Sequence, residues 1–276
     1  ALMSTSPELR PLRNVLLRIA YDGTDFHGWQ VQPARATIQG TLAAAFAELC
    51  GETVHVCGAG RTDAGVHAEE QAASVQLKTP IPLENLARAL NGRLPESIRV
   101  LSAQEVPLEF HARRDARSKI YCYRMHRGAV CPPRLARYVF PFPYPLDEAS
   151  MREAARLFEG TWDFRPFASA DASNAREEKI TIRTVYSSRL ERQNEELRYA
   201  VEGSGFLYHM VRNMVGVLIE VGRKRIEPAA IRELLVSGKG SCPGSTAPAR
   251  GLTLVRVNYP APYPDWEQTR QVMKSE

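Results

Sequence analysis

Segments with the period of a strand and segments with the period of a helix alternate along the first half of the chain. Apolar residues at every second position predict strands, and apolar residues three and four positions apart predict helices. Strands are predicted over residues 15–20, 53–57, 73–77 and 98–106. Helices are predicted over residues 38–49 and 83–90, with Gly51 and Gly92 at their ends. This alternation restricts the fold to a class that mixes sheet and helix.

The second half repeats the alternation. Strands are predicted over residues 119–125, 180–190, 197–201 and 252–257, and helices over residues 151–158, 206–221 and 228–238. The polar run 191–195 between two of these strands predicts a hairpin turn. The chain is therefore expected to form an α+β fold of two halves, residues 1–112 and 113–276.

Composition narrows the class of protein. The 276 residues, of which 44% are hydrophobic, are enough for a sizeable core. The longest apolar stretch, residues 206–221, is interrupted by polar residues, so a membrane span is not expected. The N-terminus lacks the features of a secretory signal, and five cysteines without a C-x-x-C pair argue against disulfides and zinc, so the cytoplasm is expected. A formal net charge of +5 fits a polyanionic partner.

A glycine-rich loop supplies the candidate chemical centre. Residues 58–68 crowd glycines around Arg61, Asp63 and His67. Glycine lets the backbone approach a bound molecule closely, so the loop can present Asp63 to a ligand. For a lone aspartate, a turn or capping role is the ordinary interpretation. No metal is expected beside His67, because no second His or Cys stands at ligand spacing and an arginine would repel a cation.

An arginine stands inside the most apolar predicted helix. The helix over residues 206–221 is apolar nearly all round and is expected to be buried, yet it contains Arg212. An unpaired buried charge costs roughly several kcal/mol, so Arg212 must reach solvent or an acidic partner. Asp63 is one candidate partner, and Glu202 or Glu220 would serve equally well in a structural pair. A pair with Asp63 would keep that carboxylate anionic, as a nucleophile or a base requires.

Two tyrosines share one face of the strand predicted over residues 119–125. Tyr121 and Tyr123 lie there with Lys119 and Arg124 nearby. Aromatic rings among basic residues on a sheet can stack on nucleic-acid bases. The alternative is that both rings face the hydrophobic core. The chain has no P-loop, dinucleotide fingerprint or G-x-S-x-G motif, which argues against the enzymes that depend on them.

Six segments recur in the same order in one enzyme family. They are residues 21–30, 60–68, 119–123, 160–164, 208–216 and 249–252. On these segments the chain resembles the tRNA pseudouridine synthase A family, the TruA type, over nearly its whole length. Two positions depart from the family pattern. Ile120 stands where a basic residue is frequent and Tyr208 where a histidine is frequent, so neither is assigned a catalytic role.

The resemblance implies a fold and a set of partners. The fold would be two related halves with mainly antiparallel sheets flanked by helices, joined around a central active-site cleft. The substrate would be uridine in the anticodon stem-loop of tRNA, at tRNA positions 38, 39 and 40. The protein would act as a homodimer without cofactor or metal, and neither DNA nor a membrane is an expected partner.

The resemblance also implies roles for residues of this chain. Asp63 would be the nucleophilic aspartate, Arg212 its basic partner, and Tyr121 the ring that stacks on the target uracil. The further candidates for substrate binding are Leu252, in the apolar wall of the pocket, Arg61 and His67.

The reaction implied by the family sets the chemical needs of the site. The bond from ribose C1′ to N1 breaks, the uracil turns and rejoins through C5, and the C5 proton is lost. Asp63 attacks C1′, attacks C6 or removes a ribose proton, and residue types leave these alternatives open. A stacked uridine must also be flipped out at a cost of about a few kcal/mol, which stacking on Tyr121 would offset in part. The rival hypothesis is a non-catalytic tRNA-binding or chaperone-like protein.

Overall fold

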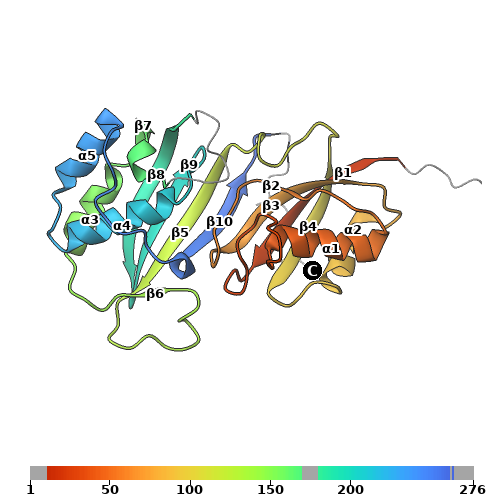
Figure 1. Cartoon of the computed structure of the whole chain (residues 1–276), viewed down its shortest axis with the longest axis horizontal. Helices are drawn as coiled ribbons and strands as arrows, with labels where there is room; N and C mark the ends of the chain where they lie inside the picture. The colour runs from red at the N-terminus through yellow and green to blue at the C-terminus, as the bar shows by residue number, and fades with distance from the viewer. Residues whose placement is uncertain (1–10, 170–179, 262, 264–276) are drawn as a thin grey trace, which may run out of the picture.

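The computed structural model describes residues 11–169, 180–261 and 263, and its first half shows the predicted alternation (Figure 1). The elements of this half are β1 (Arg13–Tyr21), α1 (Ile38–Cys50), β2 (Cys57–Gly58), β3 (His67–Leu77), α2 (Leu83–Asn91) and β4 (Ile98–Val106). Helix α1 begins where the Thr37 side chain accepts a hydrogen bond from the Gly40 amide. It ends at Gly51, whose φ of 69° is left-handed, as the sequence predicted.

The second half contains more strands and three α-helices among its described residues. Its strands are β5 (Ser118–His126), β6 (Phe140–Pro141), β7 (Gly160–Asp163), β8 (Ile182–Gln193), β9 (Glu196–Gly203) and β10 (Leu252–Asn258). Its helices are α3 (Glu148–Arg156), η1 (Arg165–Phe167), α4 (Met210–Gly222), α5 (Pro228–Ser237) and η3 (Ala249–Gly251). The predicted hairpin joins β8 to β9, with Asn194 at a φ of 54° in the turn.

One sheet runs through both halves. Its order is β4-β1-β3-β10-β5-β9-β8-β7, with β2 added to β3 and β6 added to β5. Strand β10, the last in the described chain, lies between the halves: Thr253 is opposite His67 of β3, and Leu252 is opposite Tyr123 of β5. The β3–β10 and β5–β6 pairs are parallel, and the other described pairs are antiparallel. The predicted α+β fold is confirmed, and the division at residues 112 and 113 stays a prediction.

Helices cover each half of the sheet (Figure 1). Helices α1 and α2 belong to the first half and α3, α4 and α5 to the second. Helix α4 is apolar nearly all round and is therefore buried along most of its length, where it packs against α3. Within the described ranges, no helix combines the length and the apolar character needed to cross a bilayer.

Three predicted elements differ most from the structure. The strand predicted over 73–77 begins earlier, at His67. The predicted strand 53–57 is wrong except at Cys57: Val54 and Val56 are buried, but the Val56 carbonyl accepts a hydrogen bond from Gln39 Nε2 at 3.0 Å and joins no ladder there. The helix predicted from residue 206 begins at Met210 instead. The preceding His209 has a φ of 60°, which a right-handed helix cannot include.

Candidate active site

The loop that carries Asp63 is held by hydrogen bonds to β1, to the turn that follows β1, and within the loop itself. The Trp29 amide donates to the Thr62 carbonyl at 3.0 Å, and the Val66 amide donates to the Asp63 carbonyl at 3.1 Å. The Tyr21 hydroxyl lies 2.8 Å from Thr62 Oγ1, and burial raises the pKa of Tyr21 to about 12, which keeps this hydroxyl protonated. The backbone on both sides of Asp63 is therefore fixed, and the direction of its side chain with it.

Gly28 is a point of close approach between that turn and the part of the loop next to Asp63. Its φ is 84°, and a Cβ there would lie 2.6 Å from the Thr62 carbonyl oxygen. We expect Gly28→Ala to cost about 1–3 kcal/mol, which lowers Tm by roughly 2–4 °C for each kcal/mol. Turnover is expected to fall as well, because Thr62 adjoins Asp63.

Gly51→Ala is the matched control for Gly28→Ala. Gly51 also has a positive φ, of 69°, but nothing lies within 4 Å of a Cβ added there. Calorimetry and turnover measurements on both variants separate backbone strain from displacement of the loop. Equal losses of Tm with unchanged turnover in Gly28→Ala would contradict the positioning role of this contact.

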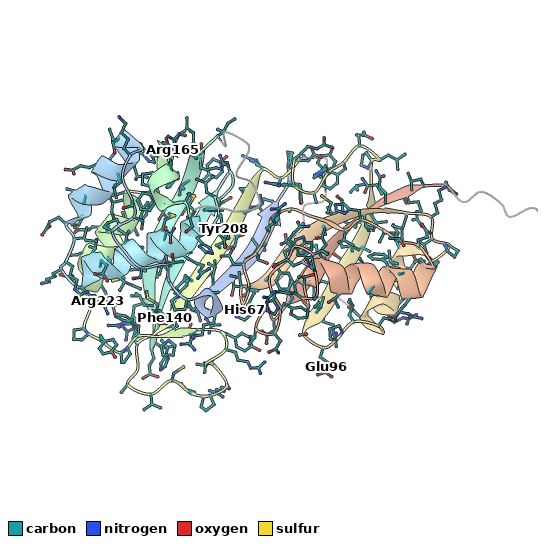
Figure 2. All side chains as sticks on the ribbon, viewed as in Figure 1. His67, Glu96, Phe140, Arg165, Tyr208 and Arg223 are labelled. Carbon is teal, nitrogen blue, oxygen red and sulfur yellow. The ribbon has the colours of Figure 1, made fainter. Side chains whose placement is uncertain are left out.

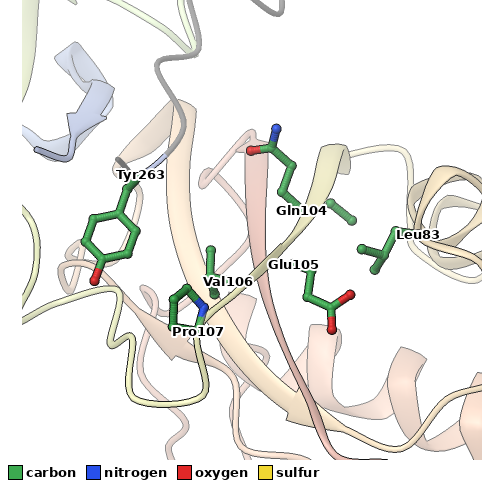
Figure 3. A pocket seen from close by; sticks show the side chains of 7 residues that line it. Leu83, Gln104, Glu105, Val106, Pro107 and Tyr263 are labelled. Carbon is green, nitrogen blue, oxygen red and sulfur yellow. The ribbon is translucent and has the colours of Figure 1, made fainter. Parts of the chain in front are cut away.

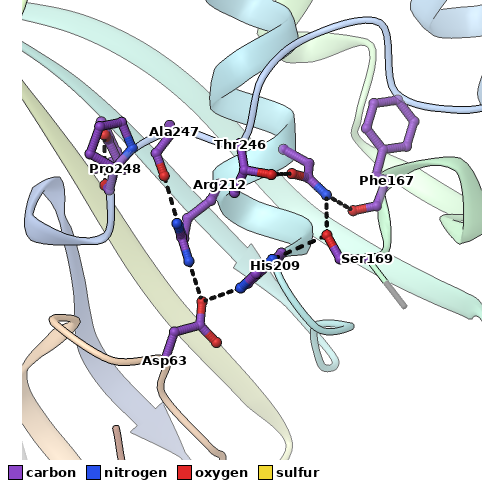
Figure 4. A network of polar contacts seen from close by, with 10 residues as sticks. Asp63, Phe167, Ser169, His209, Arg212, Thr246, Ala247 and Pro248 are labelled. Atoms are coloured by element: carbon purple, nitrogen blue, oxygen red, sulfur yellow. Dashed lines mark hydrogen bonds and ion pairs between the residues drawn. The ribbon is translucent and has the colours of Figure 1, made fainter. Parts of the chain in front are cut away.

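The start of helix α4 brings Arg212 to Asp63. His209 caps the helix in the left-handed conformation, and Arg212 lies in the first turn. Arg212 Nη1 donates to Asp63 Oδ2 at 2.9 Å, and Arg212 Nε donates to the Ala247 carbonyl at 2.7 Å (Figure 4). Both side chains of the ion pair are mostly buried, with 14% and 19% exposed. The guanidinium is thus fixed by the backbone on one side and by the carboxylate on the other.

The other partners considered for Arg212 are engaged elsewhere. Glu202 Oε1 accepts a hydrogen bond from Ser118 Oγ at 2.6 Å. Glu220 pairs with Arg223 at 2.9 Å. The contact between Asp63 and Arg212 is therefore the one the structure contains, and the catalytic roles of both residues stay predictions.

A second group, His209, also contacts Asp63 and is linked to two further polar side chains. His209 Nε2 lies 3.5 Å from Asp63 Oδ2, and His209 Nδ1 lies 3.1 Å from Ser169 Oγ (Figure 4). Burial lowers the pKa of His209, and the Arg212 charge lowers it further against the opposing effect of Asp63. A neutral ring has one N–H, so Nε2–H directed at the carboxylate leaves Nδ1 to accept from the Ser169 hydroxyl. Asn213 Nδ2 in turn donates to Ser169 Oγ at 3.4 Å.

A cleft of about 1890 Å³ opens onto Asp63 and is lined by both halves of the chain. Six arginines and one lysine line it, whereas Asp63 is the only carboxylate among its described lining residues. The cations are Arg35, Arg61, Arg113, Lys119, Arg165, Arg183 and Arg212. The positive charge per residue is much higher in this lining than in the chain as a whole. Such a surface attracts a polyanion.

The two tyrosines of β5 have different surroundings. Tyr121 lines the cleft and meets Phe206 edge to face, with ring centroids 5.2 Å apart. Tyr123 is fully buried, and its hydroxyl donates to the Pro248 carbonyl at 2.9 Å. Burial raises the pKa of Tyr121, and Tyr21 and Asp63 raise it further, so its hydroxyl is neutral. Both rings belong to the core, with Tyr121 6% exposed, but only Tyr121 borders the cleft and can contact a ligand there.

The remaining candidates for substrate binding lie in two places. Arg61 and Leu252 line the cleft with Asp63. His67 is outside the lining, at the junction of the halves (Figure 2). There its Nδ1 accepts a hydrogen bond from the Gly23 amide at 3.1 Å, and its Nε2 lies 3.1 Å from the Arg137 carbonyl. Its substrate-binding role stays a prediction.

Three residues of the site were not singled out from the sequence. The turn before α4 brings His209 to Asp63, and Ser169, two residues after η1, contacts His209. Periodicity singles out neither position. Lys119 carried a signal, since it lies two residues before Tyr121 on the same face of β5.

Among the described residues, a metal site, a reactive cysteine or a further pocket would be another candidate site. Within the described ranges, no three His, Cys, Asp or Glu side chains gather as a metal ion requires, and a metal-free reaction stays a prediction. All five cysteines are free and half-buried. A second pocket of about 470 Å³ lies along β4 between Leu83 and Tyr263 (Figure 3), and none of the candidate site residues lines it.

Known proteins match the chain over most of its length. A family profile described as tRNA pseudouridine synthase matches residues 18–115 and 154–260. A protein from Solibacter usitatus named tRNA pseudouridine synthase A is 52% identical over 90% of this chain and 100% of its own. A protein of the same name from Caldicellulosiruptor bescii is 42% identical over the same shares. A solved Cbf5-Nop10-Gar1 complex matches 87% of this chain and 57% of its own at 14% identity, and its TM-score of 0.34 is too low to carry an argument.

Proposed function

This chain belongs to the tRNA pseudouridine synthase family, and from that membership we propose that it isomerises uridine to pseudouridine in the anticodon stem-loop of tRNA. One observation carries the proposal. Asp63 and Arg212, from opposite halves, meet at 2.9 Å in a cleft where no other described lining residue is a carboxylate. The cations of the cleft can bind the phosphates of an RNA, and the aromatic ring can stack on a uracil base. The single carboxylate is then placed to react with the nucleoside.

Each group around the reacting nucleoside has a proposed role that follows from its position. Asp63 is anionic and held by Arg212 Nη1 through Oδ2, which leaves Oδ1 for the substrate. Each of the three opening steps, attack on C1′, attack on C6 or removal of a ribose proton, requires this anion. Tyr121 holds the detached uracil while it turns, and Leu252 closes the wall behind it. The C1′–N1 bond is then replaced by a C1′–C5 bond, the C5 proton leaves to solvent or a nearby base, and N1 takes up a proton, so the product is an isomer of uridine.

The finer properties follow from the same resemblance. The protein acts as a homodimer in the cytoplasm, on tRNA positions 38, 39 and 40, without a cofactor and without DNA as a partner. The rival hypothesis of a non-catalytic tRNA-binding protein has no support, because the matched relatives are named as synthases. Sedimentation of the purified protein tests the dimer directly.

The test of the proposed function is direct. Unmodified tRNA is incubated with the purified protein, and pseudouridine is mapped along the product. We expect pseudouridine in the anticodon stem-loop, with tritium released from uracil C5 in proportion. Binding of tRNA without any pseudouridine would contradict the proposal and revive the non-catalytic alternative.

Loss of the Tyr121 ring is expected to affect turnover more than binding. A single base stack contributes about 1–3 kcal/mol, and flipping the uridine out costs about a few kcal/mol. The stack therefore adds little net affinity for tRNA, but it stabilises the everted nucleotide that reacts. Tyr121→Ala should therefore lower kcat/KM by roughly tenfold to a hundredfold and leave the Kd for tRNA within about threefold. Tyr186→Ala removes a ring that is 53% exposed and lies outside the cleft lining, so it serves as the control. Equal losses of turnover and binding in Tyr121→Ala would count against the stacking role.

A further inference from the structure

Three cations form a cluster on the wall of the cleft near Asp63. They are Lys119 of β5, Arg183 of β8 and Arg113 of the link between β4 and β5, and all three line the cleft. The Lys119 side chain crosses Gly60, where an added Cβ would lie 3.4 Å from Lys119 Cε and 3.9 Å from Nζ. Gly60 is three residues before Asp63, so the ammonium lies beside the loop that carries the reacting carboxylate.

The cluster has no anionic partner among the described residues. Its members make none of the ion pairs found in the described chain, and Asp63, the only carboxylate in the described lining, is bound to Arg212. Arg183 Nη1 donates to the Ile180 and Ile182 carbonyls at 2.6 and 2.7 Å, which are neutral acceptors. Burial lowers the pKa of Lys119 to about 8, and the charges of Arg113 and Arg183 contribute to this fall.

Like charges held together in a partly buried wall are costly unless an anion joins them. The position of Lys119 indicates which anion fits. Lys119 and Tyr121 project from the same face of β5, two residues and thus about 7 Å apart. A nucleotide whose base stacks on Tyr121 would carry its own backbone phosphate toward Lys119.

We propose that Arg113, Lys119 and Arg183 form a binding site for a backbone phosphate that flanks the everted uridine. The site rests on the proposed function for the identity of the RNA. It anchors the backbone of the target nucleotide in the cleft, a binding role distinct from the chemistry at Asp63.

A charge cycle between protein and RNA tests the site. One phosphodiester of the tRNA, on the 5′ or the 3′ side of the target uridine, is replaced by a neutral methylphosphonate. Lys119→Met removes the ammonium with little loss of length. Each change alone is expected to raise the Kd of tRNA about tenfold. Lys119→Met should also reduce the slope of log Kd against log salt by roughly 0.7–0.9. Lys119→Arg should restore both values.

The decisive measurement combines the two changes. If Lys119 contacts the altered phosphate, Lys119→Met and the neutral linkage together raise Kd no more than either alone, and kcat changes far less than Kd. Lys239→Met, at an exposed lysine outside the cleft lining, should leave Kd and the salt slope unchanged. Multiplicative effects, or a wild-type Kd indifferent to both neutral linkages, would overturn the site. Because Kd is measured apart from turnover, the absence of pseudouridine in every sample would contradict only the proposed function.

Discussion

Asp63→Asn is expected to lower kcat by at least about 10⁴-fold, as the loss of an essential nucleophile or base does in other enzymes. The amide has nearly the volume of the carboxylate, so the loop can keep its hydrogen bonds through Thr62 and Val66. It cannot act as an anion, however, and all three possible opening steps need one. The Kd for tRNA should stay the same or fall slightly, because the variant removes the one negative charge of the described cleft lining.

Asp25→Asn is the control for this substitution. The Asp25 side chain is 74% exposed and pairs only loosely with Arg137, at 3.6 Å, outside the cleft lining. Tritium release from uracil C5 and mapping of pseudouridine measure turnover in both variants. Turnover of Asp63→Asn within tenfold of the wild type would show that the carboxylate does not start the reaction. Circular dichroism and Tm establish that the variant is folded.

The elements of this fold were predictable where local periodicity and end residues agree. Strand 98–106 was predicted with the ends it has, and helix α1 ends at Gly51 as expected. The strand predicted over 53–57 failed because alternating burial of Val54 and Val56 does not require a neighbouring strand. The insertion of β10 between β3 and β5 could not be predicted, because periodicity within a strand does not determine its partners.

The candidate site was predictable where a residue contradicted its surroundings. Arg212 drew attention because a cation in an apolar helix needs an acid, and glycine-rich flanks did the same for Asp63. Residue types left the choice between Asp63 and the other acids open, the family resemblance indicated Asp63, and the structure contains that contact. The position of the His209 side chain depends on a left-handed backbone conformation at this residue, and no adjacent glycine in the sequence indicates that conformation. The position of Lys119 relative to Tyr121 was visible in the sequence, but its grouping with Arg113 and Arg183 required the tertiary structure.

Arg212→Met should lower kcat/KM by about 10²–10³-fold, the usual effect of losing one preorganised electrostatic contact. Methionine keeps much of the apolar stem and a high helix propensity, so α4 should form as before. The lost contacts are those to Asp63 Oδ2 and to the Ala247 carbonyl, and the freed carboxylate has the open cleft for hydration. The loss of stability is therefore expected to be about 1–2 kcal/mol, below the 3–5 kcal/mol of a fully buried broken pair.

Arg212→Lys distinguishes charge from geometry. An ammonium restores a cation but cannot present the separate Nε and Nη1 donors that now bind Ala247 and Asp63. We expect it to recover part of the lost kcat/KM and to remain at least about tenfold below the wild type. Arg225→Met, at a side chain that is 65% exposed beyond the end of α4, should change neither kcat/KM nor Tm measurably. If Arg212→Met kept full turnover, the carboxylate would need no cationic partner, and the pair would be a structural link between the two halves.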